Sequence, residues 1–321
     1  LITHKDLKDY SSKYREPIVG LYKGYKVISM GPPSSGGVLL VNMLNMLENF
    51  DLDALGWNSS DYVHLLTEVE RRAYVDRSEH LGDPDFWSIP ISMLTSKEYA
   101  KNRIKTFSKE RATLSTDISA SKNIHNESIE TTHYSVVDKS GNAVSVTTTI
   151  NLNYGSGIIV EGAGFFLNNE MDDFSSKPGV PNVFGLIGNE ANAIEANKRP
   201  LSSMTPTIIL KDDKPFMVIG SPGGSTIITT TLQNILNVIE FNMDIEEAVS
   251  SPRFHSQWLP DVIQIEPRSL PKDVLIKLKE KGHQVVPYRW GYIGEANGIL
   301  ILKDGLYGGG DNRGETSAIG Y

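Results

Sequence analysis

The sequence predicts a globular fold in which helices and sheets form layers, with much antiparallel character in the sheets. Apolar residues recur at helical spacing between residues 38 and 47 and again between about 60 and 80. From 131 to 170 the sequence predicts strands separated by glycine turns, and valines and threonines are frequent in 136–149, as is typical of strands. A third signal is an apolar stretch near 206–219, predicted to be one strand, which leads through a glycine turn at 220–224 into a helix expected at 225–240.

The composition is that of an ordinary globular protein. The chain has 321 residues, of which 39% are hydrophobic and 22% charged, enough for a large core and for one or two domains. Its net charge is −8, and no run of Lys or Arg alternates with aromatic residues, so we expect no nucleic-acid partner. No apolar stretch approaches the roughly 18 residues of a membrane span. Cysteine is absent, which excludes disulfides, thiol catalysis and cysteine-based metal sites.

The first 120 residues are predicted to be mostly helical. One helix should follow the glycine- and proline-rich segment 31–37. A longer helix is expected to have Ser60 as its N-cap and to end at His80, before a Gly-Asp-Pro sequence. Its buried stripe would contain Val63, Leu66, Val69, Ala73 and Tyr74.

A threonine pair follows a polar segment, 121–130, that we interpret as a linker. A hydroxyl between a loose segment and a sheet suits self-cleavage of the peptide bond between Glu130 and Thr131. Cleavage would give Thr131 a free α-amino group with a pKa of about 8, which can act as general base for the threonine's own hydroxyl. An ordinary strand start has the same Thr-Thr pattern, so this segment alone leaves both interpretations open.

Three further segments have side chains or backbone suited to chemistry. Paired glycines at Gly223 and Gly224 precede a helix and could turn amide N–H groups toward an oxyanion, although a plain tight turn has the same sequence. The adjacent hydroxyls of Ser202 and Ser203 could hold a carboxylate, or could be surface serines without a role. The acids and amides of 168–173 could bind an ammonium group or a cation, or form a solvated turn.

Two other features help to define the expected site. The loop 175–200 is long and rich in proline and glycine, and such a loop inside a compact domain is usually functional, often as a lid. The seven histidines show no ligand spacing, so His133 and His255 are interpreted as structural.

Together these segments resemble the γ-glutamyltranspeptidase family, which belongs to the N-terminal nucleophile hydrolases. The resemblance rests on 31–37, on 77–84 and on most of 131–258, with the strongest signatures at 131–138, 168–174, 198–204 and 220–225. It implies an α+β fold, the four-layer αββα sandwich of that superfamily, incomplete at the N-terminus. It also implies that 1–130 is the C-terminal part of a large-subunit region ending in a cleavable linker. Residues 131–321 would be the small-subunit region, and the two would form one domain.

The resemblance assigns a role to each candidate residue. Thr131 would be both the self-cleavage residue, after Glu130, and the nucleophile, and Thr149 would orient it. Gly223 and Gly224 would form the oxyanion hole. Ser202 and Ser203 would hold the α-carboxylate of the substrate. Its α-amino group would be held by Asn151, Glu170 and Asp173. No metal or organic cofactor is implied.

The chain departs from the family pattern in two places. Only 130 residues precede Thr131, so we expect the chain to be truncated and to lack the N-terminal segment whose arginine pairs with the substrate carboxylate. The family's lid often carries a tyrosine where this chain has Phe184. Loss of that hydroxyl should loosen the closed lid.

The implied function is that of a self-processing γ-glutamyltransferase/glutathione hydrolase. Such an enzyme cleaves γ-glutamyl amides, including glutathione, through a γ-glutamyl-threonine intermediate and passes the acyl group to water, an amino acid or a dipeptide. Its two processed chains stay associated, and the family is periplasmic or extracellular. Two alternatives remain: an amidase acting on a β-lactam side chain or on poly-γ-glutamate, and a catalytically silent, unprocessed fragment that at most binds ligand.

Overall fold

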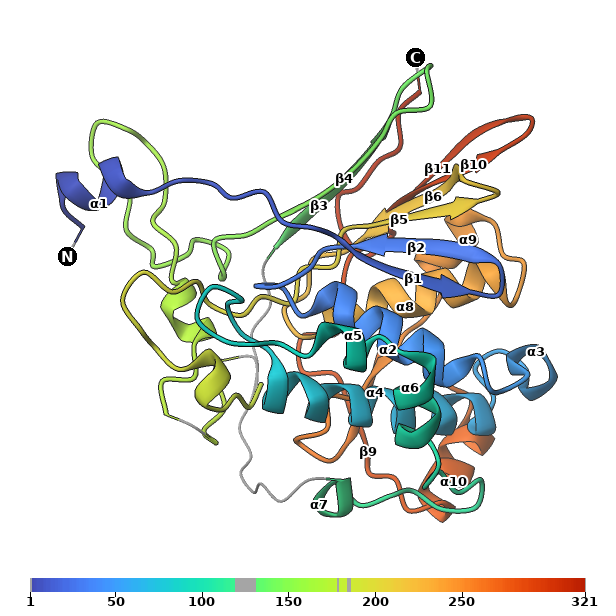
Figure 1. The fold of residues 1–321 in the computed structure, drawn as a ribbon. Helices are drawn as coiled ribbons and strands as arrows, with labels where there is room; N and C mark the ends of the chain where they lie inside the picture. Colours follow the sequence, from blue (N-terminus) through green and yellow to red (C-terminus); the bar gives the residue numbers. More distant parts are fainter. Residues whose placement is uncertain (1, 119–130, 178, 184–185, 321) are drawn as a thin grey trace.

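Helices cover one face of a central sheet and a hairpin covers part of the other face (Figure 1). The computed structural model describes residues 2–118, 131–177, 179–183 and 186–320. The predicted linker 121–130 and the predicted lid residue Phe184 therefore lie outside the described residues. The α+β class predicted from the sequence is confirmed.

The central sheet has six strands in the order β1-β2-β5-β6-β10-β11, and all neighbouring strands are antiparallel. Its register pairs Ser29 of β2 with Thr207 of β5, so segments on both sides of Thr131 share one sheet. The strands are β1 (Ile18–Tyr22), β2 (Tyr25–Ser29), β5 (Thr207–Lys211), β6 (Lys214–Gly220), β10 (Asn297–Leu302) and β11 (Gly305–Gly310).

A two-stranded sheet forms the next layer. It consists of β3 (Thr132–Val137) and β4 (Ala143–Thr148), and it packs on β5, β6 and β10. On its outer face Tyr134, Val136 and Val144 are 44–49% exposed, and the described residues place no helix over them. The described part of the chain thus supplies three layers of the predicted four-layer sandwich: helices, the six-stranded sheet and this hairpin.

The helical layer is built around α2 (Gly36–Leu47), α8 (Thr226–Ile239) and α4 (Ser60–His80). Helices α2 and α8 contact the sheet and each other, and α4 packs against α2 (Figure 1). The predicted stripe of α4 is buried, but so is nearly every other residue from Ser60 to Ser78, because the helix lies inside the molecule. Its N-cap is Ser59, whose hydroxyl accepts a hydrogen bond from the Tyr62 amide at 3.2 Å, and not the predicted Ser60.

The remaining elements are short. Strands β7, β8 and β9 form a small third sheet in which β8 and β9 are parallel. Their bounds and those of the other helices are β7 (Phe254–His255), β8 (Ile263–Ile265), β9 (Val285–Pro287), α1 (His4–Asp9), α3 (Leu52–Leu55), α5 (Ile91–Leu94), α6 (Lys97–Arg103), α7 (Ser115–Ile118), α9 (Ile245–Ser250), α10 (Lys272–Glu280), η1 (Glu170–Asp173) and η2 (Glu190–Asn192).

Three predicted elements need correction. Within the first 120 residues, predicted to be mostly helical, residues 18–29 form the hairpin of β1 and β2, because Lys23 and Gly24 both adopt the positive φ of a tight turn. The single strand predicted near 206–219 is two strands, since Asp212 and Asp213 also have positive φ and turn the chain. Beyond β4, the segment 149–170 contains turns and one isolated bridge in place of further strands. The helix predicted at 225–240 is confirmed as α8.

His133 fixes the strand that follows Thr131. Its buried ring lies 2.8 Å from the Thr147 hydroxyl and packs on Gly220, where an added Cβ would come within 2.2 Å of the ring. Burial lowers the pKa of His133 to about 4, so the ring is neutral at physiological pH. His133 therefore positions β3 on the central sheet, as its structural interpretation predicted.

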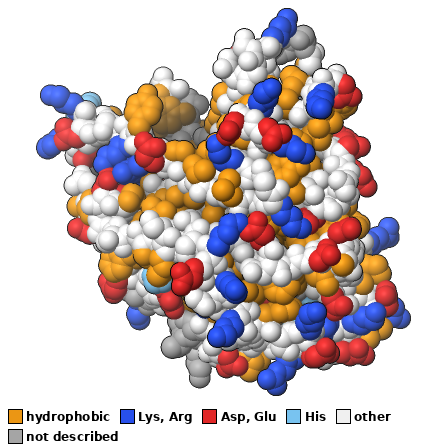
Figure 2. All heavy atoms as spheres, turned by 45° about the vertical axis from the view of Figure 1, so that its right-hand side comes forward, with side chains coloured by type: hydrophobic (Ala, Val, Ile, Leu, Met, Phe, Trp, Pro, Cys, Tyr) orange, Lys and Arg blue, Asp and Glu red, His pale blue; other side chains and the backbone are white. Residues whose placement is uncertain are grey.

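The surface in Figure 2 has Lys and Arg side chains interspersed with Asp and Glu, and hydrophobic side chains between them. None of the helices in the described ranges has the length and apolar character that crossing a bilayer requires.

Candidate active site

A small cavity gathers most of the residues predicted for the site. Its volume is about 20 Å³, which is room for one water molecule. Seven predicted residues from separate parts of the chain line it: Thr131, Thr149, Asn151, Asp173, Ser202, Ser203 and Gly224. The rest of the wall consists of Leu186, Leu201, Met204 and Ile227.

Thr131 lies directly before β3, with its hydroxyl held by Thr149. The Thr131 Oγ1 donates to the Thr149 Oγ1 at 3.2 Å, and the Thr149 Oγ1 also accepts the Asn151 amide at 2.8 Å. The backbone after β4 therefore fixes Thr149, which in turn orients the Thr131 hydroxyl. Glu130, the other residue of the predicted cleavage bond, lies outside the described residues.

Asn151 presents an unfilled acceptor at the cavity. The residue is 2% exposed, has φ of 77°, and donates from Nδ2 to the Asn169 carbonyl at 3.1 Å. Its buried Oδ1 has no hydrogen-bond partner among the described residues. Buried polar atoms are nearly always bonded in proteins, so this oxygen suits an incoming N–H donor such as an ammonium group.

Asp173 adds an acid to the same wall. Burial raises the pKa of its carboxyl to about 7, Arg77 opposes this effect, and Glu170 and Asp172 reinforce it. Glu170 starts the same 3-10 turn, and burial raises its pKa as well. It does not line the cavity, so of the two acids only Asp173 meets the other predicted residues there.

Ser202 and Ser203 both line the cavity, and each hydroxyl oxygen accepts a hydrogen bond from the protein. The Ser202 Oγ accepts the Met204 amide at 3.1 Å, and the Ser203 Oγ accepts from Nη2 of Arg77 at 3.3 Å. Within the described residues neither hydroxyl donates to an acceptor, so both remain available to a ligand. Two hydroxyl donors side by side match the two oxygens of a carboxylate.

The glycine turn before α8 places backbone amides beside Thr131. Gly224 lines the cavity, and Gly223 precedes it with φ of 135°, in the region that favours glycine. The amide N–H groups of both glycines have no acceptor in the part of the chain that the structure describes. They lie at the N-terminus of a 14-residue helix, whose dipole favours negative charge at this point.

Asn192 joins the loop 175–200 to this site, and sequence reasoning did not single it out. Its Nδ2 donates to the Asp173 carbonyl at 2.7 Å, and its Oδ1 accepts the Leu201 amide at 3.0 Å. One buried side chain thus connects the acidic turn to the serine segment. Its asparagine type in a polar loop gave no signal that could have identified it.

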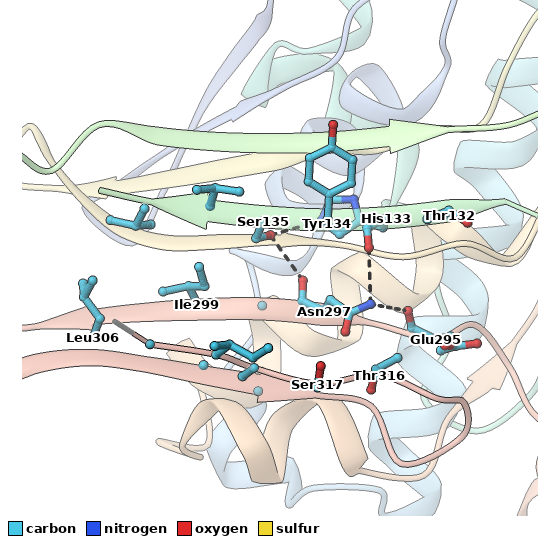
Figure 3. A pocket seen from close by; sticks show the side chains of 18 of the residues that line it. Thr132, His133, Tyr134, Ser135, Glu295, Asn297, Ile299, Leu306, Thr316 and Ser317 are labelled. Atoms are coloured by element: carbon cyan, nitrogen blue, oxygen red, sulfur yellow. Dashed lines mark hydrogen bonds between the residues drawn. The ribbon is translucent and has the colours of Figure 1, made fainter. Parts of the chain in front are cut away.

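A larger groove, of about 1320 Å³, also reaches Thr131. It lies between β3, β10, β11 and the segment 315–320, and Glu295 and Pro222 also line it (Figure 3). Asn297 connects its two sides, since its Nδ2 donates to the His133 carbonyl at 3.4 Å and its carbonyl accepts from the Ser135 Oγ at 3.4 Å. No pattern in the sequence predicted this groove.

One cluster of described residues has the donor types of a metal site. His64, Glu68 and His283 are buried, and their ligand atoms lie within 4.8 Å of one another. Glu68 is already bonded to the Arg72 guanidinium at 2.6 Å and to the Thr113 hydroxyl at 2.6 Å. The two imidazoles lie 2.7 Å apart and share a hydrogen bond. These contacts account for the cluster as internal packing of α4.

Comparisons with known proteins agree on one family. A family model described as Gamma-glutamyltranspeptidase matches residues 1–321. A glutathione hydrolase proenzyme of Escherichia coli (strain K12) is 51% identical over 314 residues, covering 98% of this chain and 54% of that protein. The chain spans about half the length of the curated relatives it matches.

Two solved structures are similar to the chain. A mutant of Helicobacter pylori gamma-glutamyltranspeptidase is 60% identical, with a TM-score of 0.55 over 57% of this chain and 100% of that chain. A cephalosporin acylase from Bacillus halodurans is 25% identical, with a TM-score of 0.82 over 100% of this chain and 56% of that chain.

Proposed function

Because the chain belongs to the gamma-glutamyltranspeptidase family, we propose that it carries the catalytic site of a γ-glutamyltransferase/glutathione hydrolase. The observation that carries this proposal is the cavity beside Thr131. Its wall contains a hydroxyl nucleophile, two hydroxyl donors, the carboxyl of Asp173 and the side-chain oxygen of Asn151, which has no hydrogen-bond partner among the described residues. That set matches an α-amino acid whose side-chain carbonyl faces the threonine.

In the proposed complex the γ-glutamyl head lies across the cavity. Its α-carboxylate accepts from the hydroxyls of Ser202 and Ser203, and its α-ammonium donates to Asp173 and to the Oδ1 of Asn151. Glu170 contributes negative charge from the same turn. The cavity is water-sized in this conformation, so binding requires displacement of a wall residue such as Leu186.

In the proposed reaction the Thr131 Oγ1 attacks the γ-carbonyl carbon. The α-amino group of Thr131, freed by cleavage after Glu130, takes the hydroxyl proton and returns it to the departing amine. The amides of Gly223 and Gly224 donate to the tetrahedral oxyanion, and Thr149 keeps the nucleophile in place. Loss of the amine leaves a γ-glutamyl ester on Thr131, which water hydrolyses or an amino acid or dipeptide amine intercepts.

The fold supports the proposal that both processed pieces stay together. Strand β2, before the cleavage bond, pairs with β5, after it, over Tyr25–Ser29 and Thr207–Lys211. We infer that 1–130 and 131–321 form one domain across the cut.

The large groove that reaches Thr131 gives the leaving amine and an acceptor a path that does not cross the head-group cavity. A periplasmic or extracellular location, as expected from the family, remains part of this proposal.

Substrate choice tests the proposal against the amidase alternative. We expect the protein to release the amine from a γ-glutamyl anilide, since the cavity has partners for both charges of the amino-acid head. An acylated β-lactam without that head should react at least about 100-fold more slowly, because the buried acid and hydroxyls would be left unpaired. The measurement is kcat/KM for each compound. Turnover of the β-lactam alone would favour an acylase, and binding of L-glutamine without any turnover would favour the silent fragment.

The pKa of Asp173 predicts how binding depends on pH. Burial raises this pKa to about 7, so the carboxyl is neutral below that value and ionised above it. An α-ammonium pairs with the ionised form, so we expect the affinity for L-glutamate, which has no γ-amide to cleave, to weaken by up to about tenfold for each pH unit below 7. Calorimetric titration between about pH 5.5 and 8 measures this. The affinity of Asp173→Asn should depend little on pH. A pH-independent affinity in the unsubstituted protein would contradict the pairing of Asp173 with the α-ammonium.

A further inference from the structure

Arg77 is a buried cation that forms no salt bridge with a carboxylate in the described part of the chain, although its charge interacts with that of Asp173. The side chain belongs to the last turn of α4, and the residue is 3% exposed. Other buried arginines have a paired acid: Arg72 lies 2.6 Å from Glu68, and Arg253 lies 2.6 Å from Asp311. Burying a charge without a counter-charge is costly. Arg77 therefore differs from the arginines that serve packing alone.

The side-chain hydrogen bonds of Arg77 go to the serine segment of the cavity wall and to Ser35, which is itself bonded to that segment. Its Nε donates to the Ser35 Oγ at 2.9 Å, and its Nη2 reaches the Ser203 Oγ at 3.3 Å and the Leu201 carbonyl at 3.4 Å. The Ser35 hydroxyl in turn donates to the Ser202 carbonyl at 2.8 Å. One guanidinium thus fixes both serines of the predicted carboxylate site, directly or through one intermediate.

This contact determines what the Ser203 hydroxyl can do. Because its oxygen accepts from a charged donor, its hydrogen must point to a different acceptor. A hydroxyl that accepts from a cation is also a stronger donor, since hydrogen bonds in a chain polarise one another. Arg77 does not line the cavity itself, so its effect on a ligand passes through Ser203 and through the field of its charge.

We propose, on the basis of the proposed function, that Arg77 is a positioning residue that gives the site its selectivity for a free α-carboxylate. It holds Ser203 as a donor and places behind the two serines a positive charge that forms no direct ion pair in the described residues. A carboxylate bound there adds a negative charge on the serine side of Arg77, whereas a carboxamide cannot. The substrates are then γ-glutamyl compounds with an ionised α-carboxylate, and α-amidated γ-glutamyl compounds are excluded.

Two probes that differ only at that group test the proposal. L-Glutamate has the α-carboxylate, and L-isoglutamine replaces it with a carboxamide; neither has a γ-amide bond that the protein could cleave. We expect calorimetry to show that the protein prefers L-glutamate, and that Arg77→Gln weakens L-glutamate binding by about 10- to 100-fold while hardly changing L-isoglutamine binding. Arg77→Lys, which keeps the charge, should retain part of the preference. Equal losses for both probes, or a preference unchanged in Arg77→Gln, would overturn the proposal.

Two further variants separate positioning from folding. Arg103→Gln removes a partly buried arginine that pairs with Asp76 at 2.8 Å, and it should lower the melting temperature without changing the preference between the probes. Ser203→Ala removes the group through which Arg77 acts, so it should reduce the preference even if the Arg77 variants do not fold. Where the Arg77 variants fold, the double variant Arg77→Gln/Ser203→Ala should show a preference between the probes that is little smaller than in either single variant. Additive losses, or a Ser203→Ala variant that keeps the preference, would contradict the proposal.

The outcome also separates this inference from the proposed function. If the unsubstituted protein binds neither probe and cleaves no γ-glutamyl anilide, the function itself is wrong. If it prefers L-glutamate and Arg77→Gln keeps that preference, the function stands and the role of Arg77 is wrong.

Discussion

Thr131→Ala is expected to abolish both self-cleavage and turnover. The Thr131 hydroxyl is the oxygen that Thr149 orients, and it lines both the small cavity and the large groove. Without it no acyl-enzyme can form, so kcat/KM for a γ-glutamyl anilide should fall by a factor on the order of 10⁴ or more. Intact-mass analysis should show a single uncut chain.

Thr131→Ser is the matched control, because it keeps the hydroxyl and removes only the methyl group. We expect this variant to mature and to turn over substrate, with a lower rate, since the smaller side chain is held less firmly beside Thr149. Activity in Thr131→Ala comparable to that of Thr131→Ser would show that another residue is the nucleophile.

The second large effect is expected from Asp173→Asn. This substitution keeps the size of the side chain but removes the negative charge that the α-ammonium meets. Truncating one member of a buried charge pair costs several kcal/mol, so KM for a γ-glutamyl substrate should rise by about 100-fold or more while kcat changes much less. Steady-state kinetics above pH 7 measures both constants, since Asp173 is then ionised in the unsubstituted protein.

Glu190→Gln is a control for loss of negative charge in the same loop region. Glu190 is exposed, lies at the start of η2, and does not line the cavity. We expect its KM to stay within about twofold of the unsubstituted value. A similar rise in KM for both variants would mean that general charge, and not contact with the ammonium, explains the effect of Asp173.

The long periodic elements and the family were predictable from the sequence, and both are confirmed. Helix α8 follows from a strong apolar pattern behind a glycine turn, and α4 has its stripe and its stop signal. The β1–β2 hairpin was missed because its strands are only five residues long and meet at Lys23 and Gly24. Short strands are stabilised mainly by the strands they pair with, here by the pairing of β2 with β5, so their own sequence gives little signal.

The candidate site was predictable only where a short sequence motif indicates a chemical role, such as a glycine turn before a helix or a pair of hydroxyls. Gly224 and Ser203 lie in such motifs, and the structure brings both to one cavity. The roles given to them remain predictions, as do those of Gly223 and Glu170, which lie outside the cavity wall. Arg77 and Asn192 could not be recognised from the sequence, because what distinguishes them is burial and the partners that distant segments supply.

The most direct test of the account is to trap and locate the covalent intermediate. The protein is mixed with a γ-glutamyl anilide, quenched with acid during turnover and digested, and the peptides are analysed by mass spectrometry. The account predicts a peptide that begins at Thr131 and carries one γ-glutamyl group on the threonine oxygen. An adduct on another residue, or turnover by a chain whose bond before Thr131 is intact, would contradict it.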